Sequence, residues 1–139
     1  MTVTQLTSIH HINFVVKDLQ ASVRSYEKTL GLTGFEYSEL PERGVSTARL
    51  SLGGVWLVLV SPHNEDSVPG RHLKKHGEGF FLLSFGVNDL EKALAEFAER
   101  GTIVSTDIVR QGLLDWRVAD LDTGAALGEM FHLTEIAAD

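Results

Sequence analysis

The stretch that decides the fold is HHINFVVKDL, residues 10–19, because a matching stretch, FLLSFGVNDL, occurs at residues 81–90. In each copy apolar residues alternate as in a strand, and an Asp then precedes a segment with helical apolar spacing. At an offset of 71 residues the two copies align without a gap: Phe14 with Phe85, Val16 with Val87, Asp18 with Asp89, and Leu19 with Leu90. The chain is therefore predicted to contain two copies of one structural unit.

A helix is predicted directly after the strand of each copy. Asp18 and Asp89 stand where an N-cap carboxylate accepts hydrogen bonds from free helical N–H groups. Gly31 and Gly101 stand where a helix ends in a left-handed turn. We therefore interpret both Asp residues as structural. The buried faces expected from the helical spacing are Leu19, Val23, Tyr26 and Leu30 in the first helix, and Leu90, Leu94 and Phe97 in the second.

Three strand-like segments follow each helix, at 34–39, 45–52 and 54–61 in the first half, and at 102–109, 114–120 and 127–134 in the second. Gly53-Gly54 favours a tight hairpin, and DLDTG at 120–124 is interpreted as the matching turn. The predicted fold class is α+β with two βαβββ modules, at about 8–62 and about 79–135, joined by a linker at 62–78. Because neither module can bury its sheet alone, residues 1–139 are expected to form a single domain.

Composition limits the function classes. The chain has 139 residues, of which 43% are hydrophobic and 22% charged, as in ordinary globular proteins. A net charge of -7 argues against nucleic acid as a partner, because phosphate binding requires a basic surface. The absence of cysteine excludes disulfides and thiolate ligands. No apolar run suits a signal peptide or membrane span, since VWLVLV at 55–60 is only strand-length, so a cytoplasmic protein with no membrane partner is expected.

Several motifs together resemble the vicinal oxygen chelate superfamily, which includes glyoxalases, bleomycin-resistance proteins and dioxygenases. They are HHINFVVKDLQASVRSYEKTLGL near the start, EDSVPGRHLKKHGEGFFLLSFGVNDL in the middle, and the repeated module itself. The EDS…HGEG linker is most similar to methylmalonyl-CoA epimerase-like members. The resemblance implies a cupped, curved mixed sheet around a central cavity, a small-molecule substrate and a homodimer. It also implies four cavity positions, one on the first and one on the last strand of each module, that usually hold a divalent metal acting as a Lewis acid.

Strand alternation selects the side chains expected to line this cavity. On the first strand, Ile12, Phe14 and Val16 should lie under the helices, so His11 should face the cavity and His10 should lie partly exposed at the strand edge. Applied to all four strands, the alternation predicts this lining: His11, Asn13, Val15, Trp56, Val58, Val60, Leu82, Ser84, Met130 and His132. Such a mostly apolar lining with a few polar groups is typical of a small-molecule site.

The resemblance places the four metal positions on His11, Val58, Leu82 and His132. Only the two histidines carry donor atoms, whereas a catalytic metal site normally has three protein ligands. No metal and no other cofactor is therefore expected. The alternative is a divalent metal held by both histidines and a relocated third ligand.

Two points about these ligands stay open. The third ligand of that alternative would be Asp115 or Glu39. Glu129 competes with His132 for the cavity, because a register slip of one residue moves every side chain of a strand to the other face.

The predicted function is metal-independent acid–base catalysis by His11 and His132, as an isomerase, epimerase, lyase or hydrolase acting on a carbonyl- or carboxylate-bearing small molecule. Asn13 and Ser84 would orient the substrate, and Trp56 would cover a ring. The first alternative is a non-catalytic protein that binds or sequesters a hydrophobic ligand or drug. The second is a divalent-metal enzyme with relocated ligands.

Basic residues provide further candidates. Arg49 and Arg117 lie in predicted strands, and either would bind a substrate carboxylate if it faced the cavity. RHLKKH at 71–76 is interpreted either as a solvated short helix or as a patch that holds an anionic substrate.

Overall fold

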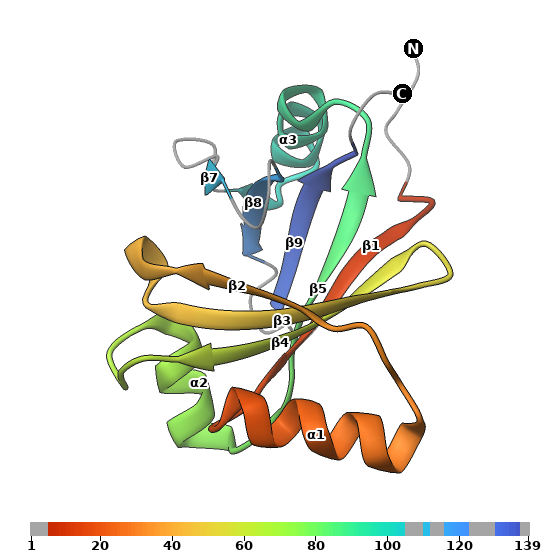
Figure 1. Ribbon diagram of the computed structural model, residues 1–139. Coiled ribbons are helices and arrows are strands. Elements are labelled where there is room, and N and C mark those ends of the chain that lie inside the picture. The colour runs from red at the N-terminus through yellow and green to blue at the C-terminus, as the bar shows by residue number, and fades with distance from the viewer. Residues whose placement is uncertain (1–5, 105–109, 112–115, 123–129, 137–139) are drawn as a thin grey trace. The chain divides into compact units, whose positions relative to one another are not determined.

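The computed structural model describes residues 6–104, 110–111, 116–122 and 130–136. Its elements follow the order strand, helix and three strands, twice (Figure 1). The first set is β1 (Ile9–Val15), α1 (Leu19–Leu30), β2 (Glu36–Leu40), β3 (Val45–Leu52) and β4 (Val55–Pro62). The second is β5 (Gly79–Val87), α3 (Leu90–Glu99), β6 (Ile103–Val104), β8 (Arg117–Asp122) and β9 (Met130–Glu135). The predicted α+β class with two βαβββ modules is confirmed.

Two short elements were not part of the predicted plan, a 3-10 turn at Pro41–Arg43 and the strand β7 (Arg110–Gln111). A third, the helix α2 (Val68–His76), contains the RHLKKH segment for which a short helix was one of the two interpretations. No helix in the described ranges is both long and apolar enough to cross a membrane.

Contacts within the chain define two compact units. The N-terminal unit comprises residues 11–81, and the C-terminal unit comprises the residues up to His10 and from Leu82 onward. Strand order is β2-β3-β4-β1 in the first, and β6-β8-β9-β5 in the second, where β7 also pairs with β8. In both, the opening strand runs parallel to the closing strand, β1 to β4 and β5 to β9. The repeat seen in the sequence is therefore a repeat of topology.

Helix α1 covers one face of the N-terminal sheet. The core there is formed by Val16, Val23, Ala48 and Leu59, against which Phe14, Leu19, Tyr26 and Phe35 pack. The expected helix face is correct for Leu19, Val23 and Tyr26. It is wrong for Leu30, whose exposed fraction is 63%, because this residue ends the helix at the Gly31 cap and has no core beside it.

Helix α3 covers one face of the C-terminal sheet in the same way. All three residues of its expected buried face, Leu90, Leu94 and Phe97, belong to the core. The strands contribute Val87, Ala119 and Leu133 to the same cluster, and Phe85 packs against it. The 3.6-residue helical period thus identified this interface correctly.

Both predicted N-caps are confirmed. The Asp18 carboxylate accepts a hydrogen bond from the N–H of Ala21 at 3.0 Å, and that of Asp89 accepts from the N–H of Lys92 at 3.1 Å. Gly31 caps the end of α1 at a φ of 71°, a left-handed conformation that glycine adopts without steric cost.

Replacing Asp18 or Asp89 by Ala is expected to lower the free energy of unfolding by about 1 kcal/mol each, because each change leaves a helical N–H without its acceptor. Urea denaturation followed by circular dichroism measures both. Asn at the same positions retains an acceptor and serves as the matched control. Equal losses for Ala and Asn would contradict the capping role.

The hairpin predicted at Gly53-Gly54 is also confirmed. The two glycines have φ values of 57° and 89°, and Leu52 pairs with Val55 across them. Positive φ at both central residues is the geometry of a type I′ turn, which matches the twist of the flanking strands. The turn interpretation of DLDTG is wrong at its start, because β8 continues through Asp122 and its pairing with β9 includes Asp120.

The predicted linker contains the helix α2. Ser67 caps it by accepting from the N–H of Gly70 at 3.1 Å, and the basic residues of RHLKKH lie along its length. Lys74 forms a salt bridge with Glu65 at 3.2 Å, and both side chains are mostly exposed. These observations fit the solvated short helix.

Candidate functional site

The six lining residues predicted for the N-terminal unit share one face of its sheet. His11, Asn13 and Val15 of β1 stand in register with Trp56, Val58 and Val60 of β4. Since paired residues of adjacent strands point to the same side, all six lie on the face opposite α1. We refer to this surface as the His11 face. His11 itself is buried, with an exposed fraction of 3%.

Strand β3 extends the His11 face with a charged residue. Arg49 stands in register with Val58, so it lies on the same face as His11, and its exposed fraction is 7%. Its Nη1 donates to Ser38 Oγ at 2.8 Å, and its Nη2 donates to Glu36 Oε2 at 2.9 Å. The guanidinium also lies over the ring of Trp56, 5.5 Å from the ring centroid. Three contacts therefore hold this cation in place.

Sequence reasoning left the face of Arg49 open, although a sufficient signal was present. A two-residue turn at Gly53-Gly54 pairs Leu52 with Val55, and counting back along both strands pairs Arg49 with Val58. Val58 also pairs with Asn13 of β1. The hairpin prediction therefore already implied that Arg49 lies on the same face of the sheet as Val58 and Asn13.

Two buried polar atoms of the His11 face have no hydrogen-bond partner among the described residues. They are the Oδ1 of Asn13 and the Nε of Arg49. Both residues flank Val58 in one row across the sheet, Asn13 on β1 and Arg49 on β3. Buried groups without a partner are rare in folded proteins because each one costs stability. This row is therefore unusual, because it holds one buried acceptor and one buried donor without hydrogen-bond partners among the described residues.

The C-terminal unit carries a second row of polar side chains. Ser84 of β5, His132 of β9 and Asp120 of β8 stand in register, on the face opposite the α3 core. His132 Nε2 lies 2.6 Å from Asp120 Oδ1. We refer to this surface as the His132 face, and the exposed fraction of His132 on it is 5%.

The other predicted residues of this unit lie near that row. Ser84 is buried, and its hydroxyl forms a hydrogen bond with the Thr134 hydroxyl at 2.6 Å. Leu82 is buried, and its backbone stands in register with Met130. Glu129, the rival of His132, lies outside the described residues.

Sequence reasoning missed the contact between Asp120 and His132. It was assigned to a turn, since Asp and Gly cluster in DLDTG, and nothing local signals a contact with a histidine twelve positions later. Only the antiparallel pairing of β8 with β9 brings the two side chains together.

His10 is half-buried and lies edge-on to Trp116, with 4.5 Å between the ring centroids. Burial lowers the pKa of His10, which favours its neutral form. This fits the predicted partly exposed strand-edge residue.

Arg117 lies on the α3 side of its sheet, because it has the same parity as Ala119, a residue of the α3 core. Its Nη1 donates to Glu135 Oε1 at 2.8 Å, and its Nη2 pairs with Glu91. The hydrogen bond from Arg117 is the main reason why the pKa of Glu91 lies below its ordinary value. Arg117 is thus a surface ion-pair residue and not a member of the His132 face.

In the described ranges one group of three carboxylates is close enough to be considered as a metal site: Asp89, Glu91 and Glu135, whose ligand atoms lie within 4.8 Å of one another. Arg117 already binds two of them, and Asp89 caps α3. The group is therefore accounted for as a helix-end ion-pair network.

The described residues fit the implied metal poorly. Of the four positions, His11 and His132 offer nitrogen donors, whereas Val58 and Leu82 are buried aliphatic side chains with none. Glu39 does not complete the set. It pairs with Ser46, on the face opposite His11, and accepts a hydrogen bond from Ser46 Oγ at 2.6 Å. The expectation that Glu39 could supply a third ligand is therefore wrong, and Asp115 lies outside the described residues.

Comparison with known proteins supplies the family context. The family model described as Glyoxalase/Bleomycin resistance protein/Dioxygenase superfamily matches residues 10–119. Bacillus subtilis (strain 168) protein YwkD is 30% identical over 105 residues, which cover 76% of this chain and 79% of YwkD.

Several solved structures with the same fold are named as methylmalonyl-CoA epimerases. A methylmalonyl-CoA epimerase in complex with methylmalonyl-CoA and NH4+ has a TM-score of 0.88 and 33% identity, with 96% of this chain and 97% of that one covered. The methylmalonyl-CoA epimerase of Mycobacterium tuberculosis has a TM-score of 0.88 and 26% identity, covering 99% of this chain and 94% of that one. A Streptomyces coelicolor variant in complex with 2-nitronate-propionyl-CoA has a TM-score of 0.88 and 33% identity, covering 96% and 100%.

Proposed function

Because the chain belongs to the glyoxalase/bleomycin resistance protein/dioxygenase superfamily, we propose that it is an isomerase of the epimerase type. Its substrate is a small molecule, such as an acyl-CoA thioester, with an acidic C–H next to a carbonyl. The observation that carries this proposal is the buried His132, held by Asp120 at 2.6 Å on a face that also carries Ser84. The similarity to methylmalonyl-CoA epimerases supports the reaction class.

His132 is the proposed general base. A carboxylate that accepts a hydrogen bond from Nε2 keeps the proton on that nitrogen and orients the ring, so Nδ1 carries the lone pair that accepts the substrate proton. The C–H bond breaks, the proton moves to the imidazole, and the electron pair remains as an enolate. Return of a proton to the opposite face of the carbon inverts the centre, and no atoms are gained or lost.

His11 is the proposed second proton-transfer group, which makes both histidines catalytic residues. Its support is its burial and its place on one face with Asn13 and Arg49. Proton abstraction next to a carbonyl requires stabilisation of the enolate charge. Arg49 is the proposed source of this stabilisation, because it is a buried cation with one N–H left over.

The remaining predicted residues are proposed to bind the substrate. Asn13 and Ser84 orient its polar groups, and Trp56 covers its flat part. The apolar contacts are assigned to the aliphatic side chains of both faces and to methionine: Val15, Val58, Val60, Leu82 and Met130.

Exchange of the substrate proton in D₂O tests this function. The purified protein is incubated with methylmalonyl-CoA and with a panel of other 2-substituted acyl-CoA thioesters and carboxylates, and mass spectrometry follows incorporation of one deuterium. We expect enzyme-dependent exchange for at least one member of the panel, because abstraction exposes the proton to solvent. Absence of exchange across the panel, with a folded protein, would contradict the proposal.

A second candidate is a protein that binds a hydrophobic ligand without turnover. The observation that favours it is the set of buried aliphatic side chains on the His11 face: Val15, Val58 and Val60. The two functions differ in one measurement, because a binding protein would retain ligand affinity and show no deuterium incorporation with any ligand it binds.

A further inference from the structure

The N-terminal unit contains a cavity on the side of the sheet opposite the His11 face. It is an open groove between α1 and the end of β1 with a volume of about 520 Å³, and Glu78 and Gly79 form part of its wall. Phe14 and Val16 line it, and these residues belong to the α1 side of the sheet. The volume suits a small organic molecule. This cavity is therefore separate from the residues proposed above for catalysis.

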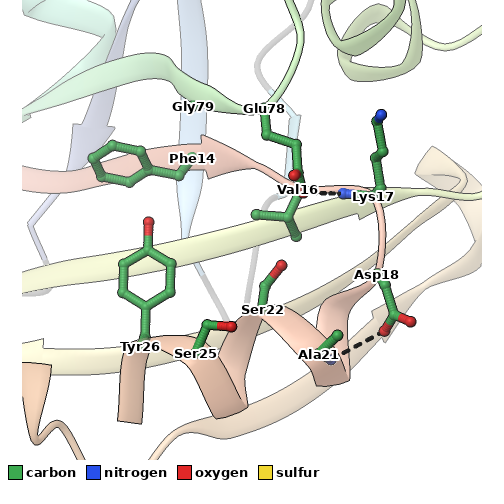
Figure 2. Close-up of a pocket in the computed structure, with 10 residues that line it drawn as sticks. All are labelled: Phe14, Val16, Lys17, Asp18, Ala21, Ser22, Ser25, Tyr26, Glu78 and Gly79. Atoms are coloured by element: carbon green, nitrogen blue, oxygen red, sulfur yellow. Dashed lines mark hydrogen bonds between the residues drawn. The ribbon is translucent and has the colours of Figure 1, made fainter. Parts of the chain in front are cut away.

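The walls of this cavity combine aromatic rings with hydroxyl groups. In Figure 2, Tyr26 and Ser22 rise from α1 toward the strand that carries Phe14 and Val16, and Ser25 lies between them along the helix. None of these three hydroxyls forms a hydrogen bond with another described residue. Burial, and then the charge of Glu78, raise the pKa of Tyr26, so its phenol stays neutral near neutral pH. The cavity thus offers three neutral hydroxyls beside two aromatic rings.

The lining of the cavity carries two carboxylates, those of Glu78 and Asp18, and one ammonium group, that of Lys17. Glu78 Oε2 accepts a hydrogen bond from the backbone N–H of Lys17 at 2.9 Å, and within the described ranges no cation pairs with this carboxylate. Asp18 adds a second carboxylate at the rim, although it also caps α1. The ammonium end of Lys17 points away from α1 in Figure 2. The negative charge of Glu78 is therefore left available to a ligand.

We propose that this cavity binds a small organic amine in its protonated form. The ammonium group lies beside the Glu78 carboxylate and donates to the hydroxyl oxygens of Tyr26 and Ser22. The apolar body of the amine packs against Phe14, Val16 and the ring of Tyr26. A cation near aromatic faces and a carboxylate gains from both.

The test uses benzylamine as the probe and benzyl alcohol as its neutral counterpart. Isothermal titration calorimetry on the full chain is expected to give binding of benzylamine that is about tenfold tighter than binding of benzyl alcohol, since one charge-assisted contact is lost. Glu78→Gln is expected to weaken benzylamine about tenfold and to leave benzyl alcohol unchanged. The amide oxygen of the variant can still accept from Lys17, so the local backbone is retained.

Two controls make the outcome decisive. Glu27 is an exposed carboxylate of α1 and does not line the cavity, so Glu27→Gln should leave benzylamine binding unchanged. Tyr26→Phe retains the ring and removes the hydroxyl, and it should weaken benzylamine several-fold. Three results would overturn the proposal: no binding of benzylamine up to about 10 mM, equal binding of benzyl alcohol, or equal losses for Glu27→Gln and Glu78→Gln.

Discussion

Replacement of His132 by Gln is expected to slow deuterium exchange at the substrate carbon by about 10²- to 10⁴-fold, which is the usual contribution of general acid–base catalysis. Gln retains a hydrogen-bonding group of similar reach but cannot carry the proton. The exchange rate is measured by mass spectrometry with saturating substrate, and the affinity is measured separately. We expect binding to change much less than rate.

Matched variants separate catalysis from folding in this experiment. Asp120→Asn removes the carboxylate that orients His132 and should slow exchange by about 10- to 100-fold, less than loss of the imidazole itself. Ser84→Ala removes a hydroxyl that is proposed to orient the substrate and breaks its hydrogen bond to Thr134. Because this variant retains both histidines, it shows how much exchange is lost without loss of a proton carrier. A His132→Gln protein that unfolds like the wild type and retains its exchange rate would contradict the assignment.

Replacement of Leu133 by Ala is expected to lower the free energy of unfolding by about 2–5 kcal/mol. Leu133 is fully buried, with an exposed fraction of 0%, in the core that α3 forms with its sheet. The change removes apolar contacts and leaves a cavity that rigid neighbours fill only in part. Urea denaturation monitored by circular dichroism measures the loss.

Leu30→Ala is the control for this prediction. Leu30 is a leucine of α1 whose exposed fraction is 63%, so its truncation is expected to change stability by no more than about 0.5 kcal/mol. A comparable loss for both variants would mean that burial does not govern the effect.

Much of the architecture followed from local patterns. The repeat at residues 10–19 and 81–90 identified both modules, and the two Asp caps and the Gly53-Gly54 turn lie where the sequence predicted them. Alternation placed Phe14 on the α1 side of its sheet, as the packing confirms. These features depend on neighbours within one helical turn or one hairpin, so a short stretch of sequence contains the whole cause.

The errors have physical causes as well. Leu30 satisfied the helical period but lies where the helix ends, and periodicity alone does not show how far a sheet extends beneath a helix. Asp120 has the composition of a turn, yet it lies in a strand because its neighbours pair with β9. Glu39 has a ligand side chain, but the register of β2 with β3 turns it away from His11. For Asp120 and Glu39, contacts distant in the chain outweighed a local preference.

The sequence by itself thus determined the two modules, the helix ends and the faces of the first strand, because alternation and capping act between near neighbours. Only the tertiary structure decided which side chains meet. Arg49 reaches Glu36 and the ring of Trp56, and His132 reaches Asp120, through strand registers. A register is set by the packing of whole strands, and a shift of one residue would move every one of these side chains to the other face.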